Sequence, residues 1–145
     1  AAWFYVAVTT DIAMYGQRTG WGQVDLAAYT DSAGDWLDGA NTYRLRVPPD
    51  APVEAFWSLT LYDVSTRCLL RNDHEIADRS SRMDLLEDPD GSVTIDIGPE
   101  APPGREQNWI PTVAGRAWFP LFRLYSPKQA FFDKTWILPD IERAQ

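Results

Sequence analysis

The sequence contains very little cysteine and histidine, and both shortages exclude kinds of site. A single cysteine, Cys68, in 145 residues rules out an internal disulfide. A single histidine, His74, rules out any site that needs two, including the zinc pattern of two histidines four residues apart on a helix. We predict no metal site and no cofactor, with calcium binding at residues 31–38 as the alternative.

Basic residues are also scarce. The 13 lysines and arginines, of which two are lysines, face 21 aspartates and glutamates, so the net charge is −8. Nucleic acids and anionic membranes attract proteins largely through basic side chains that displace counterions. We therefore expect no nucleic-acid partner.

Long apolar runs are absent as well. The apolar opening over residues 1–8 is followed by Asp11, so it is about half the length of the roughly twenty residues that a membrane-spanning helix needs. We expect no membrane insertion. No repeat or linker divides the chain. We predict one domain over residues 1–145, in which residues 1–20 are a candidate remnant of a preceding segment.

The chain does contain short strand patterns separated by turn residues. Residues 43–47 alternate apolar and charged side chains, which predicts a strand with one buried and one wet face. Residues 56–62 are large and apolar on both faces and predict a central strand, while Pro120 restricts the run over residues 118–125 to an edge or a bulged start. About seven or eight such strands without crossover helices favour an all-β fold, an antiparallel β-sandwich of jelly-roll type.

Helical signals are few. Ser126 precedes Pro127, and Gln129 follows three residues after the serine, which is typical of a helix N-terminus and predicts a short helix through Phe132. Residues 83–87 predict one further helical turn. The expected sandwich thus carries one or two short helices.

Six ordered blocks of this sequence are similar to the signature blocks of a known bacterial family. The two most distinctive are Phe-Trp-Ser at residues 56–58 and Asn-Trp-Ile-Pro at residues 108–111. The other blocks lie at residues 37–45, 90–93, 123–127 and 134–136. From residue 22 to residue 143 the chain resembles the family named Domain of Unknown Function 1214.

The resemblance implies a jelly-roll-like β-sandwich that usually forms the C-terminal part of a longer protein. In this family the N-terminal neighbour is Domain of Unknown Function 1254, so the implied partner of this chain is that domain or another subunit. A periplasmic or secreted location is likewise implied by the resemblance. The family brings no established reaction and no catalytic residues.

The most polar stretch of the chain, residues 63–82, is a candidate binding site. It holds four arginines within 16 residues, among them Arg67 and Arg71, together with Asn72. Arginine binds carboxylate, sulfate or phosphate through paired hydrogen bonds. This loop is therefore a candidate anion-binding site at one end of the sandwich. The alternative is that its arginines pair with neighbouring carboxylates in a solvated loop.

The same loop carries candidate acid and base residues for a hydrolase, namely Asp63, His74 and Glu75. The sequence contains no Gly-x-Ser-x-Gly motif, the turn that presents a nucleophilic serine in many hydrolases. Cys68 is followed by two leucines, which favours packing as a small apolar residue over a dyad with His74.

Three aspartates, Asp31, Asp35 and Asp38, lie within eight residues of turn-rich sequence. Their oxygens suit calcium, but the spacing does not match an EF-hand. Aspartate is also the residue that such turns prefer for local hydrogen bonds to the backbone. A turn role is therefore the favoured interpretation.

The seven tryptophans are either packing residues or binding residues. Trp57 and Trp118 lie within apolar strand patterns and are expected in the core. Four others lie near strand ends or loops: Trp21, Trp36, Trp109 and Trp136. They can stack on sugar faces, with Asn108 and Arg105 donating to hydroxyls, or they can plug the ends of the sandwich and pack on a partner domain.

These observations favour an accessory or assembly domain that packs on a partner and binds a small polar ligand, either sugar-like or anionic. The candidate ligand-binding residues are Arg67, Arg71, Asn72, Asn108 and Trp109. The alternative is a hydrolase of glycosidic or ester bonds with residues 63–82 at its active site. That alternative requires Asp63, His74 or Glu75 to act as acid or base in a shared cavity.

Overall fold

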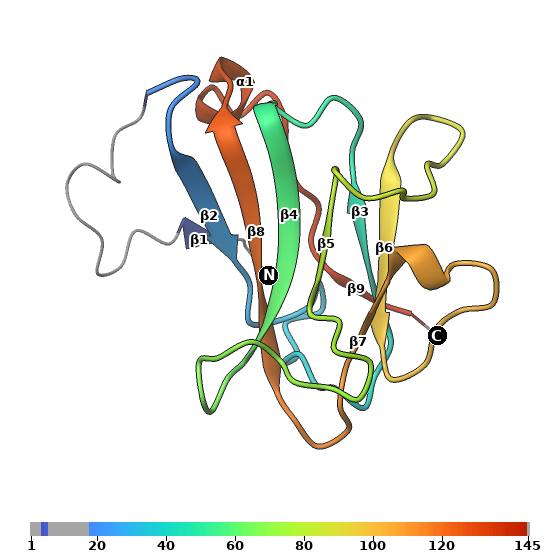
Figure 1. Cartoon of the computed structure of the whole chain (residues 1–145). Helices are drawn as coiled ribbons and strands as arrows, with labels where there is room; N and C mark the ends of the chain where they lie inside the picture. The colour runs from blue at the N-terminus through green and yellow to red at the C-terminus, as the bar shows by residue number, and fades with distance from the viewer. Residues whose placement is uncertain (1–3, 6–17, 145) are drawn as a thin grey trace.

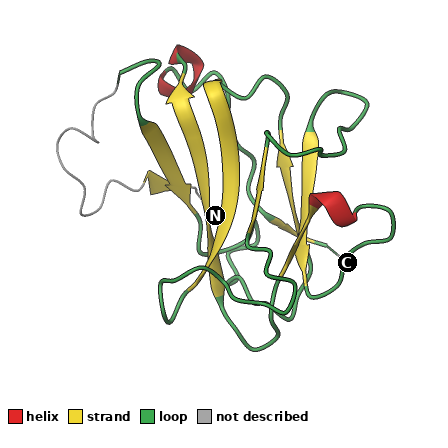
Figure 2. Cartoon of the chain, viewed as in Figure 1, coloured by secondary structure: helices red, strands yellow, loops and turns green. Residues whose placement is uncertain are grey.

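Two β-sheets face each other and enclose the core of the molecule (Figure 1). This computed structural model describes residues 4–5 and 18–144. Strands account for nearly all of the regular structure in those residues, and the short helical segments lie at the periphery (Figure 2). The fold is an all-β sandwich, as the strand patterns predict.

The larger sheet has five strands, all paired antiparallel, in the order β1-β2-β8-β4-β5. In that order they span Phe4–Tyr5, Gln23–Ala27, Trp118–Pro127, Val53–Asp63 and Asp78–Ser80. β4 and β8 are the longest strands, and they pair from Val53 opposite Pro127 to Asp63 opposite Trp118. Residues 56–62 therefore lie in an internal strand, as their apolar character on both faces predicts.

The smaller sheet has four strands in the order β7-β6-β3-β9. They span Trp109–Pro111, Val93–Gly98, Tyr43–Val47 and Glu142–Arg143. β7 runs parallel to β6, which departs from the predicted antiparallel arrangement. The reason is the connection between them, which returns through the 3₁₀ turn η2 (Glu106–Asn108) before β7 begins.

Pro120 lies inside β8, a central strand that pairs regularly with β4 from Trp118 to Tyr125, so the edge position or bulged start predicted from this proline is wrong. It faces Leu61, whose N–H donates to Ala77 and whose carbonyl accepts from Leu70, both away from β8. On the other side of β8, β2 ends at Ala27 opposite Leu121. Neither neighbouring strand needs the N–H that proline lacks, so the proline is tolerated there.

The predicted helix near the C-terminus is confirmed as α1 (Gln129–Phe132), although Lys128 rather than Ser126 occupies its N-cap. The helical turn predicted over residues 83–87 is wrong, because that segment is irregular. The Asn108 side-chain oxygen accepts from the Leu86 N–H at 2.8 Å and its amide donates to the Leu86 carbonyl. These bonds replace the local bonds that a helix would make.

The core lies between the two sheets. Its fully buried side chains include Leu59 and Leu61 of β4, Phe122 of β8, and Ile95 and Ile97 of β6. Among the described residues, no helix is long and apolar enough to cross a membrane.

Candidate functional site

Two arginines project from the outer face of the smaller sheet. Within β3, Tyr43, Leu45 and Val47 are buried, whereas Arg44 and Arg46 are exposed. Successive side chains of a strand point to opposite faces, so the two arginines share the outer face. In the pairing with β6, Arg44 lies opposite Asp96 and Arg46 lies opposite Thr94.

Asp96 fixes two arginines through one buried carboxylate. Its side chain is 0% exposed, and its two oxygens accept from the Nε atoms of Arg44 at 3.0 Å and Arg105 at 2.7 Å. Arg105, which precedes η2, also donates from Nη2 to the Thr94 carbonyl at 2.9 Å. These charge-assisted bonds orient both guanidinium groups at the sheet surface.

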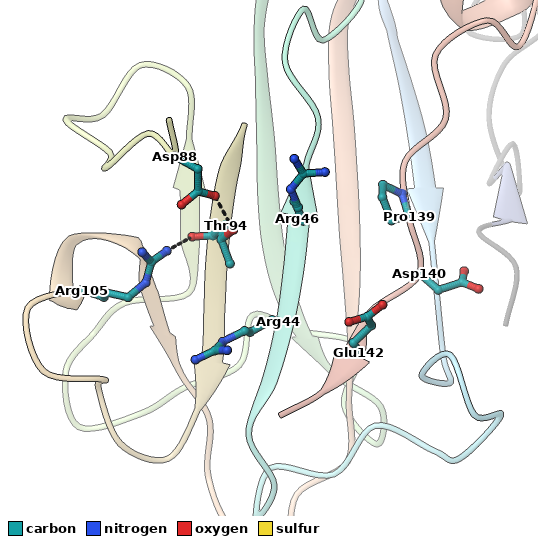
Figure 3. Close-up of a pocket in the computed structure, with 8 residues that line it drawn as sticks. All are labelled: Arg44, Arg46, Asp88, Thr94, Arg105, Pro139, Asp140 and Glu142. Atoms are coloured by element: carbon teal, nitrogen blue, oxygen red, sulfur yellow. Dashed lines mark hydrogen bonds between the residues drawn. The ribbon is translucent and has the colours of Figure 1, made fainter. Parts of the chain in front are cut away.

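The arginines line a hollow of about 500 Å³ on this face, which we call the arginine hollow (Figure 3). The lining residues come from β3, β6, β9 and the loops beside them: Arg44, Arg46, Asp88, Thr94, Arg105, Pro139, Asp140 and Glu142. Its size falls within the range of roughly 300–1,000 Å³ that small-molecule sites occupy.

Carboxylates share the arginine hollow with the arginines. Glu142 of β9 lies opposite Arg44 in the strand pairing, on the side away from Asp96. Asp88 accepts from the hydroxyls of Thr94 at 2.7 Å and Ser92 at 3.3 Å. The lining therefore presents hydrogen-bond donors and acceptors side by side.

Of the arginines in the hollow, only Arg105 was a candidate on sequence grounds. The alternation over residues 43–47 predicts that Arg44 and Arg46 share one solvent-exposed face. This pattern could have identified them as candidate site residues. Residues 93–97 alternate in the same way and place Thr94 and Asp96 on one face, but no sequence signal pairs Asp96 with Arg44, which is 52 residues away.

Within residues 63–82, Asp63 closes a turn at the end of β4. Its Oδ1 accepts from the Ser65 hydroxyl at 2.5 Å, from the Ser65 N–H at 2.8 Å and from the Thr66 N–H at 3.0 Å. The hydroxyl of Ser65 and the N–H of Thr66 hold the pKa of Asp63 below its usual range. Oδ2 lies 3.5 Å from Nε of Arg116. The carboxylate is buried and serves this turn.

Arg67 lies against an aromatic cluster. Its guanidinium carbon is 5.8 Å from the ring centre of Tyr29 and 5.3 Å from that of Phe119, and Nη1 donates to the Tyr29 hydroxyl at 3.2 Å. Phe119 also stacks on Tyr62 of β4. Arg67 is thus directed at the aromatic side chains of the larger sheet.

Arg71, Asn72 and His74 come together in a second hollow of about 430 Å³, the loop hollow, which Arg116 also lines. The Asn72 amide donates to the Ile76 carbonyl at 2.6 Å, and its oxygen accepts from the His74 N–H at 3.1 Å, so this side chain holds the loop in shape. Glu75 is exposed and is not among the residues that line either hollow.

Trp109 and Asn108 lie beneath the surface. Trp109 is 6% exposed, its indole N–H donates to the Gly98 carbonyl at 2.9 Å, and its ring meets the His74 ring edge to face. Asn108 is fully buried, and its amide donates to the Thr94 carbonyl at 2.8 Å. Asn108 thus supports the strand that forms the floor of the arginine hollow.

The aspartates of residues 31–38 make turn contacts. Asp31 Oδ1 accepts from the N–H groups of Ala33 and Asp35, both at 3.0 Å, and Asp38 Oδ1 accepts from Ala40 at 2.9 Å. Within the part of the chain that the structure describes, no three His, Cys, Asp or Glu side chains are grouped to hold a metal ion.

The remaining candidates divide between core and surface. Trp57 and Trp118 are buried, as predicted, whereas Trp21 is 65% and Trp36 is 69% exposed. Trp136 is half-buried and donates to the Pro49 carbonyl at 3.2 Å. Cys68 is exposed, so the prediction that it packs as an apolar residue is wrong. Leu70 of the same loop fills the buried position instead.

The chain shares its fold with longer proteins of solved structure. The VPA0106 protein from Vibrio parahaemolyticus is 25% identical, with a TM-score of 0.73 over 85% of this chain and 31% of that one. An uncharacterised protein from Burkholderia cenocepacia is 19% identical, with a TM-score of 0.51 over 84% of this chain and 29% of that one. The chain thus spans less than one third of the length of either protein.

Among curated proteins, none matches this chain. A family model does match it: residues 22–129 fit the family described as "Protein of unknown function (DUF1214)". The matched residues include most of both sheets and the three arginines of the arginine hollow. The chain therefore belongs to the DUF1214 family.

Proposed function

We propose that this domain is a non-catalytic binding module that holds a small polar ligand in the arginine hollow. One observation carries the proposal: the buried carboxylate of Asp96 fixes Arg44 and Arg105 at the floor of a hollow of about 500 Å³. Guanidinium groups that are already oriented lose less side-chain entropy when a ligand binds, which raises affinity.

Hydrolysis is the weaker alternative. The carboxylate of Asp63 is engaged in its own turn, and Glu75 is outside the lining of both hollows. His74 lines the loop hollow with Arg71, but the neighbouring Asn72 amide is occupied by backbone groups. Hydrolysis needs an acid and a base within reach of one bond, and of the three candidates Asp63, His74 and Glu75 only His74 lines either hollow.

An accessory role beside another domain or subunit is part of the proposal. It is supported by the length of the solved structures that share the fold, because this chain covers 31% and 29% of them. The family resemblance suggests Domain of Unknown Function 1254 as that partner.

The test is isothermal titration calorimetry with four probes: D-glucuronate, D-gluconate, D-glucose and inorganic phosphate. Arg46→Ala is the informative variant, because Arg46 pairs with Asp90 at the surface and does not hold the buried Asp96. Arg71→Ala, in the loop hollow, is the matched control. We expect at least one probe to bind, Arg46→Ala to weaken it about tenfold, and Arg71→Ala to leave it unchanged.

Two results would overturn the proposal. One is that none of the four probes binds the wild-type domain. The other is that Arg71→Ala weakens binding while Arg46→Ala does not, which would place the ligand in the loop hollow.

A further inference from the structure

We infer that the ligand of the arginine hollow is an acidic sugar, meaning a molecule with a single carboxylate on a carbon skeleton that carries several hydroxyls. The inference rests on the proposed function and names the class of ligand for that site.

The arginines select an anionic group. Arg44 and Arg46 lie two residues apart on the same face of β3, about 7 Å apart along the strand, and Arg105 approaches Thr94 and Asp96 from the other side of β6. Because Arg44 meets Asp96 through Nε, its terminal nitrogens extend beyond the ion pair. The two oxygens of a planar carboxylate can accept two parallel hydrogen bonds from the N–H groups of one guanidinium group.

The carboxylates in the lining restrict how much negative charge the ligand can carry. Arg44, Arg46 and Arg105 are matched in number by Asp88, Asp140 and Glu142. Two further carboxylates pair with the arginines: Asp96 with Arg44 and Arg105, and Asp90 with Arg46. The hollow thus has no excess of positive charge. A dianionic or polyanionic ligand would be repelled by these acids, whereas one carboxylate can be held by the arginines alone.

The same acids select hydroxyls. Asp88 already accepts from the hydroxyls of Ser92 and Thr94, and Glu142 lies beside Arg44 at the opposite side of the hollow from Asp88 (Figure 3). Ionised carboxylates only accept hydrogen bonds, so they favour ligands that donate. Apart from Pro139, every lining side chain is charged or carries a hydroxyl, so polar groups of a ligand meet hydrogen-bonding partners throughout the hollow.

The experiment compares affinities by isothermal titration calorimetry at pH 7.5 in 50 mM salt. D-glucuronate is the ring form of the proposed class and D-gluconate is the open-chain form. D-glucose lacks the carboxylate, and inorganic phosphate lacks the hydroxylated skeleton. We expect at least one of the two sugar acids to bind at least tenfold more tightly than both glucose and phosphate.

Two variants separate the parts of the inference. Arg46→Ala should bring the affinity for the preferred sugar acid close to that for glucose, because the carboxylate loses a partner. Glu142→Gln keeps the shape of the side chain and removes one negative charge. It should therefore reduce the difference in affinity between the sugar acid and phosphate. Circular dichroism and Arg71→Ala control for folding and for the loop hollow.

The outcomes distinguish the inference from the proposed function. If phosphate binds in a manner that depends on Arg46 and both sugar acids fail to bind, the acidic-sugar inference is wrong and the binding module stands. If glucose equals the sugar acids, the inference is also wrong. If no probe binds, both are wrong.

Discussion

Asp63 and Asp96 are both buried carboxylates, but they have different partners and different consequences. Asp63 accepts mainly from uncharged groups of its own turn, Ser65 and Thr66. Asp96 accepts from two guanidinium groups that come from separate parts of the chain. The first carboxylate stabilises a local turn, and the second orients side chains at the surface of a sheet.

The contacts of Asp63 predict its titration. Because these hydrogen bonds lower its pKa in the folded state, its contribution to stability is present above the unfolded-state pKa of about 3.9 and is lost as the pH falls through the lower, folded value. Burial raises the pKa of Asp25, in spite of the nearby Arg123 guanidinium. Carboxyl NMR titration should therefore show Asp25 protonating at a higher pH than Asp63. The reverse order would contradict the hydrogen bonds assigned to Asp63.

The connections between strands depend on close approaches that sequence patterns do not reveal. Gly39 follows Asp38 in a turn, and its N–H donates to the Arg116 carbonyl at 2.9 Å. A Cβ atom at Gly39 would lie 2.1 Å from the Val113 carbonyl oxygen. Residues 37–40 therefore pack closely against the loop that precedes β8.

Gly39→Ala should destabilise the domain by about 3 kcal/mol, because the added methyl group would collide with backbone that cannot move independently. Ala40→Ser, at the exposed neighbouring position, should change the free energy of unfolding by less than about 0.5 kcal/mol. Urea denaturation followed by tryptophan fluorescence measures both. Equal stability of the two variants would contradict the close packing at Gly39.

Local patterns predicted the elements better than the site. The alternation over residues 43–47 is confirmed as β3, and the apolar run over residues 56–62 lies within β4. Of the predicted site residues, Arg71, Asn72 and His74 line one hollow, while Arg67 stacks on Tyr29 and Phe119 elsewhere. A strand pattern depends on consecutive residues, but the meeting of side chains depends on which strands pair and in which register.

The segment after α1 connects the larger sheet to the smaller sheet. After α1, which follows the larger sheet, the chain crosses to the smaller sheet and pairs there with β3 as β9 (Figure 1). Ile141 is 1% exposed in the core, and its carbonyl accepts from the Ser32 N–H at 2.8 Å. The same crossing segment brings Asp140 and Glu142 to the arginine hollow.

Ile141→Ala should therefore lower the free energy of unfolding by about 2–5 kcal/mol, because it leaves a cavity in the core where the chain crosses between the sheets. Arg143→Ala, on the exposed side of β9, removes one hydrogen bond to Asn41 and should cost about 1 kcal/mol or less. Chemical denaturation distinguishes the two. A loss as small for Ile141→Ala as for Arg143→Ala would show that the segment that crosses between the sheets adds little to the stability of the sandwich.

The sequence by itself determined the class of fold and much of the core. Residue periodicity, turn residues and the apolar surroundings of Trp57 and Trp118 predict a β-sandwich with these two side chains inside, because such preferences act between residues close in the chain. Only the tertiary structure decided that β7 runs parallel to β6 and that Arg44 and Arg105 meet on Asp96. Those contacts join distant segments, and they form because the burial of both sheets on one core selects the strand order and register.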